Sequence, residues 1–334
     1  MSLRTVHEHL WELGRSRRLA PDRPAEPGAM VVDPAHVLRF RARATRLDRR
    51  LPAGSWRDAA YGGLQDSAPR AALLALHARQ EGTGPGSWED PALVQVWFRW
   101  SDYVVPAADF AVFTLGVLPR DPERAAALEA IGAEVREALA GRELRTSEVR
   151  AVRPHLADVE PEAARLELAR RFLGWHGPAT ADRFAKWAAV SRADARATWA
   201  ALAPELVPVA VEGRARDVLA RDVDALTGCE PPAGVRLLPQ GDPYLALDQA
   251  WAHADRPPPP IEDGAGAPLT TRLVNSLSGR VLVDGRLAGA WGRERDRVAI
   301  HLWRRDEPDR ERIAAEAVGF AGPIGRPVRL RWLR

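Results

Sequence analysis

Three short polar side chains stand directly before an apolar run, and their types are suited to holding a water molecule. Gln65, Asp66 and Ser67 precede the alanines and leucines that follow Arg70. An amide can both accept and donate hydrogen bonds, a carboxylate can accept a proton, and a hydroxyl holds a water only weakly. The same cluster could instead only cap the helix that the apolar run predicts, because aspartate and serine are favoured N-cap residues. The residues by themselves leave both interpretations open.

Arginine supplies almost all of the positive charge. Lys186 is the only lysine among 48 basic residues, while the formal net charge is only +3. A guanidinium can bind phosphate through two hydrogen bonds, so clustered arginines are candidates for contact with nucleic acid. A GC-rich genome would also favour arginine codons, so the composition alone does not decide. The arginine-rich stretches are Arg39–Arg50, Glu212–Asp222 and Gly292–Arg297.

The composition argues against several other kinds of site. The single cysteine, Cys229, excludes intrachain disulfides and multi-cysteine zinc sites, and the eight histidines show no metal-binding spacing. No apolar run approaches the roughly 18 residues of a membrane span. The N-terminus lacks the apolar core and cleavage site of a secretory signal, so we expect a cytoplasmic protein. From the cysteine count and the histidine spacing we expect no metal. We also expect no cofactor, because no phosphate-binding glycine loop is present.

The segment 161–219 predicts its fold most clearly. Thr180 and Ser191 each cap a predicted helix, and alternating apolar residues on both sides of Glu212 and Gly213 predict a two-stranded hairpin. Three helices followed by a hairpin make a winged helix, whose third helix would enter the major groove of DNA. The helices are predicted at Pro161–Leu173, Ala181–Val190 and Arg192–Leu202.

Four arginines of this segment are candidate DNA contacts. Arg192 and Arg196 lie one turn apart on the third helix, while Arg214 and Arg216 follow the hairpin turn. These are positions at which we expect contacts to phosphate. Small helix-turn-helix units also occur as scaffolds that never bind nucleic acid, so an interaction scaffold remains an alternative.

The preceding part of the chain predicts mostly helices. Asp33 can cap a helix whose first residue is Pro34, and a helix from Pro69 to Arg79 follows the polar cluster. Residues 92–117 indicate an apolar strand or buried helix, then a polar turn, then another helix that begins near Pro106.

The last third of the chain is rich in predicted strands. A buried strand is followed by a turn at Gly241, and the Asp-Gly pair at 284 and 285 predicts a tight hairpin turn. The charged run Arg293–Arg297 predicts the next turn. Its Arg293 and Arg295 are further candidate DNA contacts.

The chain is long enough for more than one core, since 334 residues exceed what one core usually organises. We predict an α+β protein with tandem winged-helix motifs and a C-terminal β-rich subdomain; Arg145–Pro154 is similar to a fragment of another winged helix. The predicted segments are an N-terminal extension and linker (1–32), a first winged-helix unit with the polar cluster (33–120), further winged-helix units (121–226) and the β-rich subdomain (227–334).

Five stretches, taken in order, resemble the AlkZ/YcaQ-type winged-helix DNA glycosylases. They are GLQDSAPRAALLALHAR, VVPAADF, FLGWHGPATADRFAKWAAVS, LLPQGDPYLALD and GRVLVDGRLAGAW, and they fall within residues 33–330. The resemblance implies a monomeric, monofunctional DNA glycosylase that acts on double-stranded DNA. Its reaction would be hydrolysis of the N-glycosidic bond of alkylated bases.

The resemblance also assigns roles to the polar cluster. The family signature is Gln-x-Gln, or Gln-x-Asp in one branch, just before a helix; Gln65 matches its first position and Ser67 stands at the second. An alkylated purine leaves readily, so an amide that orients water can suffice, with Asp66 or Asp102 as a substitute base. Serine departs from both patterns, and the histidine usual near Tyr103 is absent. The alternative is therefore a noncatalytic winged-helix DNA-binding protein, a regulator or damage binder.

Overall fold

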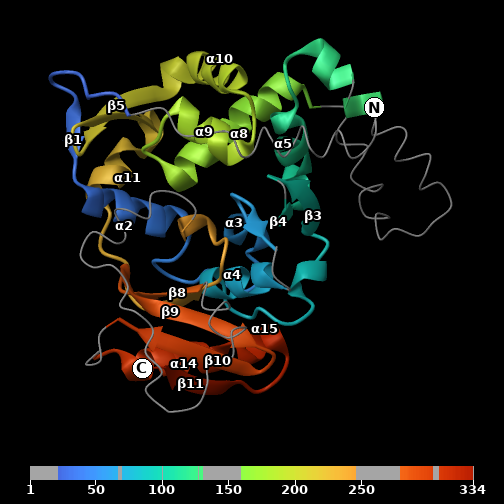
Figure 1. Cartoon of the computed structure of the whole chain (residues 1–334), viewed down its shortest axis with the longest axis vertical. Helices are drawn as coiled ribbons and strands as arrows, with labels where there is room; N and C mark the ends of the chain where they lie inside the picture. Colours follow the sequence, from blue (N-terminus) through green and yellow to red (C-terminus); the bar gives the residue numbers. More distant parts are fainter. Residues whose placement is uncertain are drawn as a thin grey trace. The chain divides into compact units, whose positions relative to one another are not determined.

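The structure is a computed structural model that describes residues 22–66, 70–99, 101–126, 128–130, 159–245, 279–303 and 308–333. The described residues form an α+β protein, as the sequence predicts, and their strands make three sheets (Figure 1). The chain forms two compact units. The first contains the described residues of Met1–Val32, Val96–Trp100 and Ala107–Val223, and the second contains those of Asp33–Gln95, Ser101–Pro106 and Asp224–Arg334. The division into four sequence segments stays a prediction.

The first unit is built around three capped helices and a hairpin. Thr180 accepts a hydrogen bond from the backbone N–H of Arg183, and Ser191 accepts one from Asp194, so both predicted caps are confirmed. The hairpin turns at Glu212 and Gly213 as predicted. This order of elements is consistent with the predicted winged helix. The elements are α8 (Pro161–His176), α9 (Ala181–Ala188), α10 (Arg192–Leu202), η5 (Ala203–Glu205), β5 (Leu206–Val211), β6 (Arg214–Leu219) and η6 (Ala220–Asp222).

Aromatic side chains fill the centre of this unit. Phe172 of α8 lies 5.2 Å from Trp187 and 5.5 Å from Phe184 of α9, measured between ring centroids. Phe98 reaches the same group, 5.3 Å from Trp187 and 5.4 Å from Phe113. Large buried rings supply much apolar area per residue, so this cluster fixes how the helices pack.

Residues 22–32 belong to the first unit and are not the linker that the sequence predicts. β1 (Met30–Val32) pairs in parallel with β5, beside which it lies in Figure 1. Ala25 donates to the carbonyl of Gly213, and Ala215 donates to that of Arg23. Backbone pairing requires no particular side chains, so a stretch rich in proline and glycine can add to a sheet. Residues 1–21 lie outside the described residues, as does the predicted fragment Arg145–Pro154.

The N-terminal part of the second unit carries the polar cluster. Asp33 caps its first helix by accepting from Ala35, with Pro34 at the first position, as predicted. The elements are α2 (Pro34–Ala44), α3 (Trp56–Ala59), β2 (Leu64–Gln65), α4 (Ala71–Arg79) and η1 (Ser87–Glu89).

The stretch after this helix differs from the prediction. Residues predicted to form a polar turn are a strand, β4 (Ser101–Pro106), which follows β3 (Leu93–Phe98). The sheet order is β2-β4-β3, so β4 is the central strand. The apolar Tyr103, Val104 and Val105 are buried there, and their pairing on both sides outweighs the polar Ser101 and Asp102. The helical segments that follow are η2 (Ala107–Asp109), α5 (Phe110–Thr114) and η3 (Leu115–Val117).

A five-stranded sheet forms the rest of the second unit. Its order is β11-β10-β9-β8-β7, and only the pair of β10 with β11 is parallel among these described strands. Buried Trp291, Ile313 and Phe320 belong to one core that joins the sheet to α14. The elements are α11 (Val223–Gly228), β7 (Val235–Leu238), η7 (Pro243–Leu245), β8 (Gly279–Val283), β9 (Arg286–Glu294), β10 (Arg297–Leu302), α14 (Arg310–Gly319), α15 (Ala321–Ile324) and β11 (Arg329–Leu333).

Candidate functional site

Gln65 is held in an extended conformation by the strand next to it. It pairs with Tyr103 of β4, while Leu64 pairs with Val104, and the N–H of Asp66 donates to the carbonyl of Asp102 at 2.8 Å. Three successive residues are therefore fixed to β4 through their backbone. Gln65 is half-buried.

The amide of Gln65 touches side chains of β4 and a backbone from elsewhere in the chain. Its Nε2 lies 3.5 Å from the Ser101 Oγ, and the Tyr103 hydroxyl donates to its Oε1 at 3.4 Å. Both hydrogen bonds are long and therefore weak. Gly241 lies closer: a Cβ added there would clash with Oε1 and lie 2.8 Å from Cδ. The amide thus rests against the Gly241 backbone, in a place that a side chain would otherwise fill.

A buried ion pair fixes the residue next to Gly241. Arg79 of α4 forms two hydrogen bonds with Asp242, at 2.7 and 2.8 Å, and both side chains are 0% exposed. The carboxylate of Asp242 also accepts from the backbone N–H of Tyr244 at 3.0 Å. A two-pronged guanidinium–carboxylate pair restricts orientation as well as distance.

Asp66 contributes a hydrogen bond to the start of α4, although Arg70 stands at the N-cap position that the structural alternative gave to Asp66 or Ser67. Its Oδ1 accepts from the backbone N–H of Ala72 at 2.9 Å, in the first turn of α4. Burial raises the pKa of Asp66, although its hydrogen bond to Ala72 and the charge of Arg70 act the other way. Ser67 lies outside the described residues. Asp102 is exposed, and its backbone carbonyl is the group that contacts Asp66.

Of the four arginines proposed from the winged helix, Arg196 and Arg214 are exposed and Arg192 is half-buried. Arg192 begins α10, and Arg196 lies one turn later with its side chain 66% exposed and 3.7 Å from Asp182. Arg214 is exposed at the start of β6, directly after the hairpin turn. Exposed guanidinium groups on a helix and a hairpin can bind phosphate at little desolvation cost.

Arg216 does not have the predicted role of an exposed phosphate contact. It is 3% exposed, and its guanidinium forms an ion pair with Asp22, which also pairs with Arg183 at 3.3 Å. Burial raises the pKa of Asp22, but the hydrogen bonds and charges of the two arginines outweigh this and hold the pKa below its usual value. Side chains alternate between the two faces of a strand, and along β6 this places Arg216 on the buried face. A stretch rich in arginine does not reveal which of its arginines will be buried.

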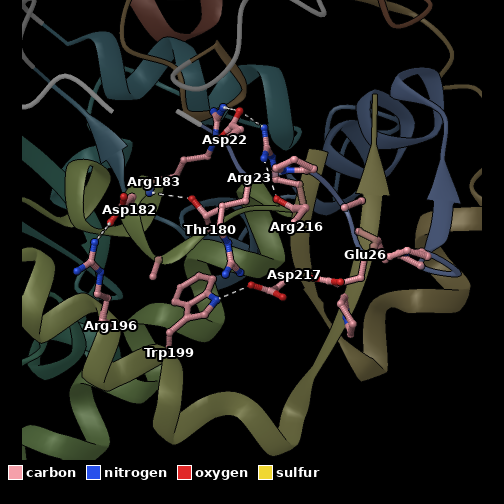
Figure 2. Close-up of a pocket in the computed structure, with 18 of the residues that line it drawn as sticks. Asp22, Arg23, Glu26, Thr180, Asp182, Arg183, Arg196, Trp199, Arg216 and Asp217 are labelled. Atoms are coloured by element: carbon pink, nitrogen blue, oxygen red, sulfur yellow. Dashed lines mark hydrogen bonds and ion pairs between the residues drawn. The ribbon is translucent and has the colours of Figure 1, made fainter. Parts of the chain in front are cut away.

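A cavity of about 740 Å³ lies in the first unit between the 22–29 segment, the start of α9, α10 and the hairpin (Figure 2). The indole N–H of Trp199 donates to Asp217 at 2.8 Å, as Figure 2 shows. Sequence reasoning missed this cavity because its residues come from distant stretches. Its charged lining residues balance in sign, namely Arg23, Arg183, Arg196 and Arg216 against Asp22, Glu26, Asp182 and Asp217.

The two remaining arginines lie in the second unit. Arg293 is half-buried near the end of β9, where burial and the nearby Arg326 lower its pKa. Arg295 is exposed at the turn before β10, and its carbonyl accepts from Arg293 at 2.9 Å. The turn is the one predicted from the charged run. Among the described residues, no group of three His, Cys, Asp or Glu side chains is arranged to hold a metal ion, and no helix is long and apolar enough to cross a membrane.

The fold and the polar cluster define an α+β protein with elements in winged-helix order and an amide held at a strand end. A family model described as DNA glycosylase AlkZ-like matches residues 145–322, more than half of the 334 residues. The chain therefore belongs to the AlkZ-like DNA glycosylase family, as its sequence motifs predict.

A curated relative and a solved structure, both from Streptomyces sahachiroi, are similar to this chain. The interstrand DNA cross-link repair glycosylase is 29% identical over 166 residues, which are 48% of this chain and 41% of that relative. The solved structure of DNA glycosylase AlkZ matches with a TM-score of 0.65 at 19% identity, over 91% of this chain and 100% of that one. At this identity the structural match shows a shared fold. The sequence match spans less than half the length of the curated relative.

Proposed function

We propose that this chain is a monofunctional DNA glycosylase that hydrolyses the N-glycosidic bond of alkylated bases in double-stranded DNA. Membership of the AlkZ-like family supports the activity, as does the name of the related cross-link repair glycosylase. The observation that carries the proposal is the amide of Gln65, which is half-buried and held by β4 and Gly241 at the first position of the family motif.

The proposed reaction needs a positioned water and a base that leaves readily. The water oxygen bonds to C1′ of the sugar while the bond from C1′ to the base nitrogen breaks. The electron pair leaves with the base, which neutralises the positive charge of an N7-alkylguanine, and the water proton passes to solvent. A carbonyl oxygen has two lone pairs. Gln65 Oε1 accepts a long hydrogen bond from Tyr103, and in this proposal it also accepts one from the water.

The test is release of N7-alkylguanine from duplex DNA under single-turnover conditions. We expect wild-type protein to release the base and Gln65→Ala to lower the rate by about 100-fold or more, because loss of a water-positioning group costs about that much. DNA binding should stay almost unchanged. Equal rates for the two proteins would refute the role of Gln65.

One observation favours a noncatalytic DNA-binding protein as the second candidate. The carboxylate of Asp66 serves as a helix cap, which argues against its acting as a base. The second motif position is held by Ser67, a weaker water ligand than glutamine or aspartate. Wild-type protein that binds duplex DNA with a strong salt dependence, but releases no base from any alkylated duplex, would support this candidate.

In this proposal each unit makes its own contacts with DNA, through arginines that are exposed or half-buried. They are Arg192, Arg196, Arg214, Arg293 and Arg295. Arg216 is left out because of its buried pair with Asp22. We also propose that the protein acts as a monomer in the cytoplasm and needs neither metal nor cofactor. Sedimentation at working concentration tests the first point, and activity in excess chelator tests the last.

A further inference from the structure

A residue far away in the sequence, Gly241, contacts the amide of Gln65. Gly241 lies against the amide, and its neighbour Asp242 is tied to Arg79 of α4 by the fully buried ion pair. Arg79 and Asp242 are 163 positions apart, so the pair joins the helix that follows the motif to a loop of the C-terminal part of the unit. The amide of Gln65 therefore rests against the backbone of a distant stretch of the chain.

We propose that Gly241, held in place by the Arg79–Asp242 pair, is a positioning residue for the Gln65 amide. The proposal rests on the proposed function where it concerns the rate of base release. The placement of the amide, however, can be tested without any reaction.

The backbone of Gly241 lies so close to the Gln65 amide that it restricts the positions that the amide can take. The hydrogen bonds from Gln65 to Ser101 and from Tyr103 to Gln65 are 3.5 and 3.4 Å long, and hydrogen bonds of this length are weak. A glutamine side chain has freely rotating bonds. The backbone of Gly241 acts as a steric wall that restricts this rotation. Gly241 has φ +79, a conformation that glycine adopts without strain.

The buried ion pair accounts for the stability of this wall. Arg79 also donates to the carbonyl of Ala75 at 3.0 Å, so its guanidinium is anchored within α4. Asp242 receives bonds from both Arg79 and Tyr244. With neither side chain exposed, water does not compete for the pair.

Gly241→Ala tests the wall, because its methyl group must displace the Gln65 amide. Gly54→Ala is the matched control: Gly54 has φ +83 in the same unit, but a Cβ there meets nothing within 4 Å. Both variants carry the same backbone strain, and only one moves the amide. The probe is the pair of Gln65 side-chain NH2 signals in a nitrogen–proton NMR spectrum, identified by their loss in Gln65→Ala.

We expect Gly241→Ala to shift these signals and Gly54→Ala to leave them unchanged. The rate of base release should fall by about 10- to 100-fold in Gly241→Ala, as expected for a misplacement of about 1 Å. The double variant with Gly241→Ala and Gln65→Ala should release the base no more slowly than Gln65→Ala alone, because no amide is left for Gly241 to position.

Arg79→Lys tests the ion pair, since lysine keeps the charge but lacks the two-pronged geometry. We expect smaller shifts of the Gln65 signals than in Gly241→Ala. Unchanged signals would remove the pair from the proposal.

Two results would overturn the role of Gly241: Gln65 signals and rates in Gly241→Ala equal to those of Gly54→Ala, or a further loss of rate in the double variant. If wild-type protein releases no base, the proposed function fails, and the amide signals alone decide the positioning role.

Discussion

Two arginines with the same predicted role have opposite environments. Arg196 is an exposed side chain on α10, with only a 3.7 Å contact to Asp182, whereas Arg216 is 3% exposed and paired with Asp22. An exposed guanidinium costs little to transfer to phosphate, but the buried one would have to leave a carboxylate behind. Burial at each residue therefore separates candidate contacts with DNA from residues that stabilise the unit.

Arg196→Ala and Arg216→Ala should consequently have different effects. In the first, we expect weaker binding to duplex DNA and a plot of log affinity against log salt that is less steep by about 1, since about one phosphate contact is lost. The second should lower the free energy of unfolding by about 2 kcal/mol, because Asp22 loses a buried partner. Binding titrations over a salt series and urea denaturation measure these effects. An unchanged salt slope for Arg196→Ala would exclude Arg196 from the DNA surface.

At the scale of elements, the start of α4 depends on Asp66. Its carboxylate accepts from Ala72, while Arg70 at the cap position is in the left-handed region, with φ 63, and offers no side-chain hydrogen bond of its own to the helix end. The guanidinium of Arg70 stacks instead on the Trp88 ring at 3.7 Å. A residue of the motif therefore stabilises the first turn of α4, the helix that contains Arg79.

Comparison of Asp66→Ala with Asp66→Asn separates capping from catalysis. Alanine should lower the free energy of unfolding by about 1 kcal/mol, whereas asparagine caps nearly as well and should retain stability. If Asp66 only caps, Asp66→Asn also retains the rate of base release. Thermal unfolding and single-turnover assays of both variants provide the test. A stable Asp66→Asn protein with a rate at least about tenfold lower would make Asp66 the base.

For the whole molecule, a histidine couples stability to pH. The Nε2 atom of His77 is buried, its ring contacts Phe320 at 5.7 Å, and Arg50 donates to its backbone carbonyl at 2.7 Å. Burial, together with the charges of Arg50 and Arg236, lowers the pKa of His77 from 6.5 to about 4. The folded protein therefore keeps this imidazole neutral where the unfolded chain would protonate it.

The contribution of His77 to stability should be complete above pH 6.5 and disappear as the pH falls toward 4. In that window the unfolded chain binds one more proton at this site, which lowers the free energy of unfolding by about 2–3 kcal/mol. Urea denaturation between pH 7 and pH 4 measures the change. His77→Leu, which cannot titrate, should lose this part of the pH dependence. A variant with the same pH profile as wild type would show that His77 is not the group responsible.

The sequence by itself determined the features that depend on neighbouring residues. The helix caps at Thr180 and Ser191 and the turn at Gly213 were predictable because a cap or a tight turn is made within a few positions. The α+β class and the family followed from the order of such elements and motifs. Gln65 could be singled out as a candidate, but its surroundings could not.

Only the tertiary structure decided which distant groups meet. No residue near Gln65 in the sequence indicates that Gly241 lies against its amide. Arg216 is likewise 194 positions from Asp22, with which its buried guanidinium forms an ion pair. The strand at Ser101–Pro106 likewise forms because partners lie on both sides of it. Burial and pairing depend on how the whole chain packs, and a short window of sequence does not show which distant residues will pack against it.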